Sequence, residues 1–265
     1  MFRAILSRDI HSLIYCANRH DGGKRLLTGD NKLMKIQPFK VYDPKRQVEP
    51  ALDQRKIVQA ALSLLDEVGL DGLTMRSLAK KLGIKAASLY WHVHSKQDLL
   101  NLMADEICAP MHKPDRTLPW RNQLEILGNE YRRVLLAHRD AARVLANSGA
   151  PSGPNRLRLT EIVLNILLDA GFDQQDAVYA GFLLNEYVTM FVSGETQYEN
   201  TEAKSDSEGS SSDVQNWIEA LPPNDYPSIV ALAGYLIKSD ADERFRFGIE
   251  ILRSGLETRL ATRSA

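Results

Sequence analysis

The sequence predicts an all-α protein, because three features of its pattern agree. From Asp53 onward, apolar residues recur at three- and four-residue spacing, which lays an apolar stripe along one face of a helix. Residues that begin or end helices, such as threonine, serine, glycine and proline, stand at the boundaries of these stretches. The chain has no run of alternating β-branched residues, so we expect no β-sheet and a fold in which helix packs on helix.

Length and composition set the first limits on function. The 265 residues suffice for one large domain or two modest ones. The formal net charge of −1 argues against a polycation of the ribosomal or histone type, although a local basic face could still bind nucleic acid. Cys16 and Cys108 lack metal-type spacing and predict a reducing cytoplasm without a disulfide framework.

The hydropathy pattern predicts no membrane partner. No apolar run reaches the roughly 18 residues that a membrane span needs. The N-terminal stretch MFRAILSRDIHSLIYCANRH has charges within its apolar patch and no small-residue cleavage site, so we expect no signal peptide.

Residues 1–50 differ in charge from the rest of the chain. They hold ten lysines and arginines against five acids, and prolines at 38, 44 and 50 would break any long element. We interpret this stretch as a basic, disordered extension, or as sequence upstream of a true start at Met34. The alternative is a basic arm that contacts DNA phosphates.

Residues 51–107 are expected to form a first domain of four helices, at 53–69, 74–81, 85–91 and 96–107. Thr74 and Ser95 are good N-caps, and Asp98 three residues after Ser95 resembles a capping box. Gly69 and Gly83 stand where helices end. Two short helices joined by a glycine-bearing turn and backed by a longer helix form the helix-turn-helix pattern.

Residues 108–265 are expected to form a second helical domain after a proline-rich connector. Its helices are predicted near 120–137, 140–147, 155–169, 174–194, 227–238 and 241–261. The segment TEAKSDSEGSSSD, residues 201–213, is polar and acidic, and predicts a mobile surface loop over about 196–213.

The short helix over 85–91 is the candidate DNA reader. A B-DNA major groove about 12 Å wide accepts one helix, and small residues at 86–88 would let its backbone approach the base edges. Tyr90 and Trp91 would offer a hydroxyl, an indole N–H and flat apolar surface to sugar and phosphate. The basic residues around the turn are Arg76, Lys80, Lys81, Lys85 and Lys96. Phosphate contacts of this kind predict strongly salt-dependent binding.

Two other interpretations of these residues stay open. Tyr90 and Trp91 could be core aromatics. His92 and His94 form an H-x-H pair that could be half of a metal site, but no third ligand stands at helical or hairpin spacing. We therefore expect no metal and no cofactor.

The run LTMRSLAKKLGIKAASLYWHVHSKQDLLNLM, residues 73–103, resembles the DNA-binding domain of the tetracycline-repressor (TetR) family. The resemblance is strong over 53–107 and traceable to about 261. Its later landmarks are Trp120, RRVLLAHRDAARV at 132–144, AGF at 170–172 and Tyr179. It implies a transcriptional repressor that binds operator DNA as a dimer and releases it on binding a small molecule.

The resemblance implies roles for the residues of the first domain. Arg76 would reach a base or phosphate, and residues 86–88 would occupy the base-reading turn. Residues 90–92 would pack against phosphates, and Lys96 would clamp another. The DNA-binding candidates are Arg76, Lys85, Ala86, Ala87, Ser88, Tyr90, Trp91, His92 and Lys96. Because Ala86 replaces a glutamine of the tetracycline repressors, we expect a different operator.

The resemblance also implies an effector pocket in the second domain. His112 stands where the family uses a histidine to hold the drug's polar ring, and Tyr131 replaces an aromatic pocket residue. Leu127, however, replaces a drug-binding amide, and Leu145 a metal-binding histidine. Magnesium–tetracycline is held by coordination and hydrogen bonds that leucine cannot supply. We expect a larger hydrophobic effector instead.

The candidate effector residues include several that could simply be core residues of the domain. They are His112, Leu127, Tyr131, Leu145, Ser148, Val163, Leu164, Val178 and Phe182. Gly194 replaces a metal-side carboxylate of the family, and Glu195 one residue on could restore that group if the register shifts. The linking helix at 96–107 would tilt on effector binding and change the 34–36 Å spacing of two reading heads.

Apolar stripes on the last two long helices predict a homodimer with a four-helix interface. The stripes are Ala177, Ala180, Gly181, Leu184, Val188 and Phe191, and then Phe245, Gly248, Ile249, Leu252, Gly255, Leu256 and Leu260. Packing of these stripes within one chain is the alternative.

Two other functions are alternatives to a repressor. A helical enzyme could use His112 and His138 as acid and base, but no nucleophile–base pair or phosphate loop accompanies them. A partner-binding module that has lost DNA binding has the change at Ala86 as its only support. We therefore predict a DNA-binding regulator that is not an enzyme.

Overall fold

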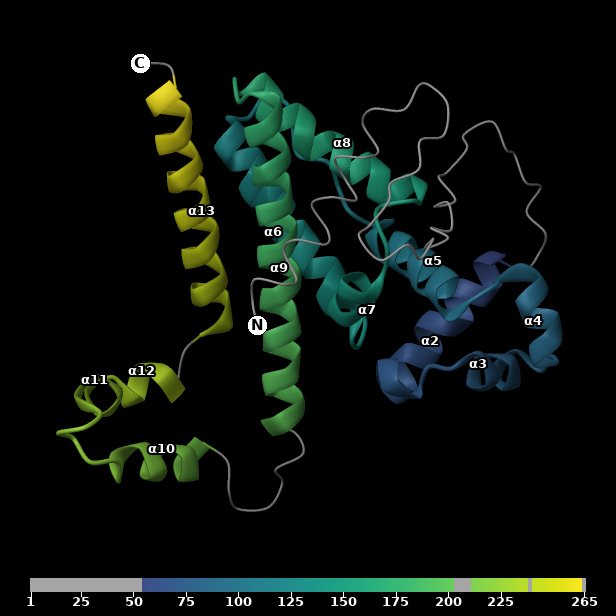
Figure 1. The fold of residues 1–265 in the computed structure, drawn as a ribbon, viewed down its shortest axis with the longest axis horizontal. Helices are drawn as coiled ribbons and strands as arrows, with labels where there is room; N and C mark the ends of the chain where they lie inside the picture. Colours follow the sequence, from purple (N-terminus) through teal and green to yellow (C-terminus); the bar gives the residue numbers. More distant parts are fainter. Residues whose placement is uncertain (1–53, 203–210, 238–239, 264–265) are drawn as a thin grey trace, which may run out of the picture. The chain divides into compact units, whose positions relative to one another are not determined.

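The computed structural model describes residues 54–202, 211–237 and 240–263. The predicted N-terminal extension lies outside the described residues. Every regular element that the structure describes is an α-helix, which confirms the predicted fold class. Figure 1 shows these helices in chain order.

The first four helices form the helix-turn-helix part of the chain. They are α2 (Gln54–Gly72), α3 (Met75–Leu82), α4 (Ala86–His92) and α5 (Lys96–Cys108). α2 packs on α3 and α5, and α3 packs on α4. Leu65, Leu78 and Leu99 are fully buried among them. These helices share one small apolar core, which orients α4.

The predicted helix boundaries are confirmed in this part. Thr74 accepts a hydrogen bond from the Ser77 amide, and Ser95 accepts one from the Asp98 amide. Gly83 ends α3 with a φ of 68°, a left-handed conformation that favours glycine. Gly69, with a φ of 72°, interrupts α2 where the sequence predicted its end, and one further turn follows.

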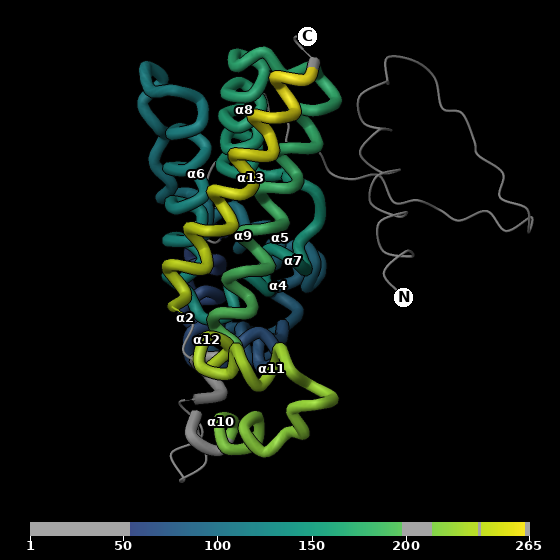
Figure 2. The backbone as a smooth tube through the Cα atoms, turned by 90° about the vertical axis from the view of Figure 1, so that its left-hand side faces the viewer, coloured from purple at the N-terminus to yellow at the C-terminus, as the bar shows by residue number. Residues whose placement is uncertain are grey.

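The larger part contains eight further helices among the described residues. They are α6 (Trp120–Leu136), α7 (Ala141–Asn147), α8 (Pro154–Asp169), α9 (Gln174–Glu202), α10 (Ser211–Glu219), α11 (Pro227–Ala231), α12 (Ala233–Ile237) and α13 (Ala241–Arg263). α9 packs against α6, α7 and α8. α13 lies along α6 and α9, as Figure 1 and Figure 2 both show.

The structure corrects the prediction for the segment after residue 194. The mobile loop was expected over about 196–213, but α9 continues through Glu202 and α10 begins at Ser211; residues 203–210 lie outside the described residues. Glu195 holds this end of α9 through its ion pair with Arg132 on α6. The single helix expected at 227–238 is two short helices that meet at Leu232, whose φ of −105° and ψ of 10° break the helix.

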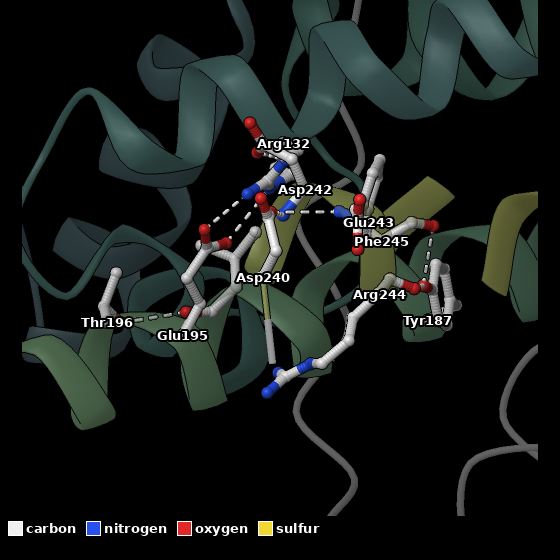
Figure 3. A network of polar contacts seen from close by, with 10 residues as sticks. Arg132, Tyr187, Glu195, Thr196, Asp240, Asp242, Glu243, Arg244 and Phe245 are labelled. Carbon is white, nitrogen blue, oxygen red and sulfur yellow. Dashed lines mark hydrogen bonds and ion pairs between the residues drawn. The ribbon is translucent and has the colours of Figure 1, made fainter. Parts of the chain in front are cut away.

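An arginine on α6 joins the three long helices (Figure 3). Arg132 donates to Glu195 on α9 and, at 2.6 Å, to Asp242 on α13. Its guanidinium also lies 4.9 Å from the ring centroid of Phe245. Because the side chains of Arg132 and Glu195 are only 12% and 6% exposed, breaking the pair would leave a buried charge uncompensated.

The predicted pairing stripe of α13 is wrong at two of its first three residues, Phe245 and Ile249. Phe245 and Ile249 are 1% and 4% exposed, because they pack inside the chain against α9 and α6. The apolar residues that remain on the surface lie on other faces of the same two helices. They include Tyr179, Leu183 and Met190 on α9, and Phe247 and Ile251 on α13.

Polar contacts join the end of α2 to the corner between α6 and α7. Asp140, in a left-handed conformation with a φ of 57°, accepts a hydrogen bond of 2.8 Å from the Leu70 amide. Asp66 accepts from the Arg139 amide and from the imidazole of His138, and Arg143 forms an ion pair with Asp71. The helix-turn-helix part is thus attached to the larger part by α2 as well as by α5.

A second set of polar contacts ties α5 to the link between α7 and α8. Gln97 donates to the Asn147 carbonyl at 2.9 Å, and Asn101 accepts from the Gly149 amide at 2.7 Å. Buried Asp105 accepts from the Arg156 amide at the N-terminus of α8, where the helix dipole favours a carboxylate. These contacts therefore attach α5 to the link between α7 and α8 and to the first turn of α8.

Replacing Gly153 with alanine is expected to lower the free energy of unfolding by about 1–3 kcal/mol, because overpacking a filled site forces side chains or backbone to shift. The added Cβ would lie 2.2 Å from the carboxyl carbon of Asp105. Chemical denaturation measures the change. Gly234→Ala on α12 is the matched control, since its Cβ would meet no heavy atom within 4 Å. Equal stability of the two variants would contradict the close approach at Gly153.

Candidate DNA-binding helix and effector chamber

Two buried apolar side chains one helical turn apart hold α4 against the core. Leu89 is fully buried and Val93 is 1% exposed, so both point into the core formed with α2, α3 and α5. Ala86 is partly buried against the same core. The Nδ1 atom of His94 lies 3.2 Å from the Tyr90 carbonyl oxygen, within hydrogen-bonding distance, near the C-terminal end of the helix. The opposite face of α4 is left to solvent.

The exposed face of α4 carries most of the predicted base-reading and phosphate-contacting residues. Trp91 is 83% exposed and Tyr90 is 47% exposed, so the interpretation of both as core aromatics is wrong. Ala87, Ser88 and His92 are exposed as well. Such exposed aromatic side chains do not contribute to the core formed by the described residues, and exposed apolar surface of this kind is typical of interaction sites.

The positive charges around α4 fall into two groups. Lys81 forms an ion pair with Glu67, and its hydrogen bond lowers the pKa of that carboxyl. The other basic residues of the turn and the next cap are exposed and, within the described residues, make no ion pair: Arg76, Lys80, Lys85 and Lys96. Four exposed cations beside the aromatic face fit a nucleic-acid backbone.

Four of the predicted effector residues come from facing sides of α6, α8 and α9. Leu127 on α6 is buried, and Val163, Leu164 and Phe182 are partly buried. α6, α8 and α9 pack pairwise on one another. We use the name effector chamber for the region between these three helices and the end of α5, where the sequence predicts that the effector binds.

Tyr131 forms a polar centre in the chamber together with two residues that the sequence analysis did not predict, Asn185 and Thr189. Its hydroxyl donates to the Asn185 amide oxygen at 2.9 Å and lies 3.2 Å from the Thr189 hydroxyl. Burial raises the pKa of Tyr131 far above its usual value. Asn185 and Thr189 lie four residues apart on α9, a spacing that could have indicated a shared helical face.

The other predicted effector residues lie apart from this centre. The His112 side chain is 81% exposed and contacts Glu130, whose pKa falls to about 2 because Arg133 and then His112 hydrogen-bond to its carboxylate. Val178 is 39% exposed. Leu145 is buried on α7, and Ser148 donates to its carbonyl at 2.7 Å.

A shallow apolar pocket lies between α6, α9 and α13. It is lined by Leu124, Ala180, Leu183, Leu184, Ile249, Leu252, Arg253 and Leu256. None of the predicted effector residues lines it, whereas five residues of the predicted pairing stripes do. The pocket is therefore a gap in packing within one chain.

The described residues offer no metal cluster and no membrane span. Across 54–202, 211–237 and 240–263, no group of three or more His, Cys, Asp or Glu side chains could hold a metal ion. Glu195, which a shifted register would have made a metal ligand, is paired with Arg132. None of the helices in this part of the chain is both long and apolar enough to cross a bilayer.

Family models match both parts of the chain. Residues 57–103 match the bacterial regulatory proteins of the tetR family, and residues 113–260 match the tetracyclin repressor-like C-terminal domain. The chain belongs to the tetR family. The first match covers α3 and α4, and the second begins in the connector and ends in α13.

Individual relatives of the tetR family are similar over most of their length. An HTH-type transcriptional regulator of Saccharopolyspora erythraea is 37% identical over 81% of this chain and 89% of its own. The class D tetracycline repressor protein of Escherichia coli is 34% identical over 79% and 91%. The crystal structure of ActR from Streptomyces coelicolor in complex with actinorhodin has a TM-score of 0.70 and 34% identity, covering 78% of this chain and 97% of ActR.

Membership in the tetR family decides between the functional classes. The protein is a DNA-binding transcriptional regulator and not an enzyme. TetR-type regulators act as ligand-responsive dimers, which agrees with the predicted homodimer. His112 and His138, the acid–base pair of the enzyme hypothesis, bind separate carboxylates, Glu130 and Asp66.

Lys96→Ala is expected to reduce the slope of log affinity against log salt concentration by about one, because each neutralised phosphate releases about one counterion. Fluorescence anisotropy with a duplex that the protein selects from a random pool gives the slope. Lys113→Ala is the control, because Lys113 is an equally exposed lysine in the connector between α5 and α6. An unchanged slope for Lys96→Ala would remove Lys96 from the DNA contact.

Proposed function

We propose that the protein is a homodimeric, cytoplasmic repressor whose two α4 helices read successive major grooves of one operator, and that an apolar small molecule releases it. The observation that carries the proposal is the exposed aromatic face of α4 between exposed cations. The proposed DNA contacts are those predicted from the sequence: Arg76, Lys85, Ala86, Ala87, Ser88, Tyr90, Trp91, His92 and Lys96.

The dimer places the two reading helices at a fixed separation. Two copies of α4 must lie about 34–36 Å apart to enter successive major grooves. The exposed apolar residues of α9 and α13 supply a surface for a twofold interface: Tyr179, Leu183, Met190, Phe247 and Ile251. An isologous interface of two helices from each copy buries these residues and fixes that spacing.

Release follows from the contacts of α5. An effector that occupies the chamber between α6, α8 and α9 displaces the start of α8, which Asp105 and Asn101 tie to α5. A tilt of α5 changes the separation of the two α4 helices. The effector shifts the population toward the released state only if it binds that state more tightly.

The chamber is suited to an apolar effector and not to magnesium–tetracycline. Leu127 and Leu145 cannot coordinate a metal ion, and Glu195 is held by Arg132. ActR, a relative of similar fold, was crystallised with actinorhodin, a molecule other than tetracycline. We therefore place the proposed effector contacts at Leu127, Tyr131, Val163, Leu164 and Phe182.

The experiment that tests the function is selection of bound duplexes from a random pool, followed by footprinting. We expect one operator with two related half-sites and protection over two successive major grooves. Tyr90→Ala is expected to abolish the footprint and leave the dimer folded, as circular dichroism and sedimentation would show. Tyr235→Ala, which removes an 80% exposed tyrosine on α12, is the matched control. A normal footprint from Tyr90→Ala would contradict the assignment of α4.

Magnesium–tetracycline at micromolar concentrations is expected to leave the complex with the selected operator intact, because Leu127 and Leu145 replace the amide and the histidine that hold the drug in the tetracycline repressors. Anisotropy of the labelled operator measures release. A tetracycline repressor of known response, assayed with its own operator, serves as the positive control. Release of this protein's operator under the same conditions would show that Leu127 and Leu145 lie outside the effector site.

A further inference from the structure

Arg158 on α8 is an arginine of the chamber whose hydrogen bonds are incomplete. One terminal nitrogen of its guanidinium donates to the Ala109 carbonyl at 3.3 Å. Its Nε is buried and, within the described residues, has no hydrogen-bond acceptor. Nearly all buried N–H groups in folded proteins have a partner, so an orphaned one calls for an explanation.

The charges around Arg158 do not balance. Arg156, Arg158 and Asp105 all lie near enough to Cys108 to act on its ionisation, so two cations and one anion share this region. The oxygens of Asp105 already accept from the Arg156 amide at 2.9 Å and from the Asn155 side chain at 3.0 Å. Neither arginine forms an ion pair with an acid among the described residues. Among the charged groups that act on Cys108, the two arginines therefore outnumber the one carboxylate.

The surroundings of this charge are largely apolar. Cys108 is buried, and burial raises the pKa of its thiol to about 12, so the thiol stays neutral. Leu159, Ile162 and Val163 of α8 are only partly buried against the core, so this helix face is incompletely covered. A cation in apolar surroundings without a counterion is unfavourable, and binding an anion relieves that cost.

We propose that Arg158, assisted by Arg156, is the anion-recognition point of the effector chamber. The effector is then an apolar molecule that carries a negatively charged oxygen group, such as a carboxylate or an ionised phenol. The Nε and a terminal nitrogen of a guanidinium form a fork that matches two such oxygens or one shared oxygen. This inference rests on the proposed function, since it assigns the chemistry of the effector that the chamber takes.

Arg253 on α13 offers a matched comparison. Its Nε is also buried without an acceptor among the described residues, but its guanidinium forms an ion pair with Glu125. Arg253 therefore shares the orphaned N–H with Arg158 and lacks the uncompensated charge. We therefore expect an anion to bind at Arg158 and not at Arg253.

Two fluorescent probes that differ only in charge test the proposal on the full-length protein. They are 8-anilinonaphthalene-1-sulfonate, which is an anion, and N-phenyl-1-naphthylamine, its neutral counterpart. We expect Arg158→Gln to weaken binding of the anion about tenfold or more and to change the affinity of the neutral probe less than twofold. Arg253→Gln is expected to change neither affinity. Arg158→Lys, which retains the charge, is expected to retain most of the affinity for the anion. This variant still tests the proposal if Arg158→Gln does not fold.

The outcomes separate this inference from the function on which it rests. An unchanged anion affinity in Arg158→Gln, an equal loss in Arg253→Gln, or a tenfold loss in Arg158→Lys overturns the anion-recognition point. If the neutral probe still binds in those cases and the selected operator is still footprinted, the proposed repressor with an apolar effector stands. If neither probe binds the wild-type protein, the chamber itself is disproved together with its anion-recognition point.

Discussion

The burial of Leu89 and Val93 is the constraint on which the DNA-reading surface depends. A seven-residue helix is not stable alone in water, because helix nucleation fixes several residues for few hydrogen bonds. α4 exists because these two side chains enter a core built by α2, α3 and α5. Their direction also decides what faces outward. With both turned inward, Tyr90 and Trp91 necessarily point away from the core, and the same packing that folds α4 exposes its reading face.

Polar contacts join the two parts of the chain at specific residues, in addition to the apolar core that runs through both parts. α5 belongs to both parts. Asn101 accepts a hydrogen bond from the Gly149 amide in the link before α8, and Asp105 accepts one from the Arg156 amide in the first turn of α8. Asp66 and Asp140 attach the end of α2 to the corner after α6. Hydrogen bonds of this kind have discrete arrangements, which lets a small shift in the larger part become a rotation of the smaller one.

Local signals in the sequence predicted most of the fold. Thr74, Gly83 and Ser95 act within one helical turn, so a single sequence suffices to place the boundaries of α3, α4 and α5. The failures concern contacts between distant residues. Whether Phe245 faces a partner or its own chain depends on Arg132 and α6, more than 100 residues earlier, and the pattern of α13 alone is the same in both cases. The buried Nε of Arg158 without an acceptor could not be predicted either, because it depends on how distant parts of the chain pack around this side chain.

The protein's three tryptophans occupy three different environments. Trp91 is 83% exposed on α4, Trp217 is 64% exposed on α10, and Trp120 is half-buried with its ring 5.5 Å from that of Phe172. Indole emission depends on solvent polarity and on access by quenchers. Trp91 and Trp217 therefore both contribute red-shifted, quencher-accessible emission. In a Trp217→Phe variant this component comes from Trp91 and reports the occupancy of α4 without any added dye, while Trp120 provides an internal reference in the same spectrum.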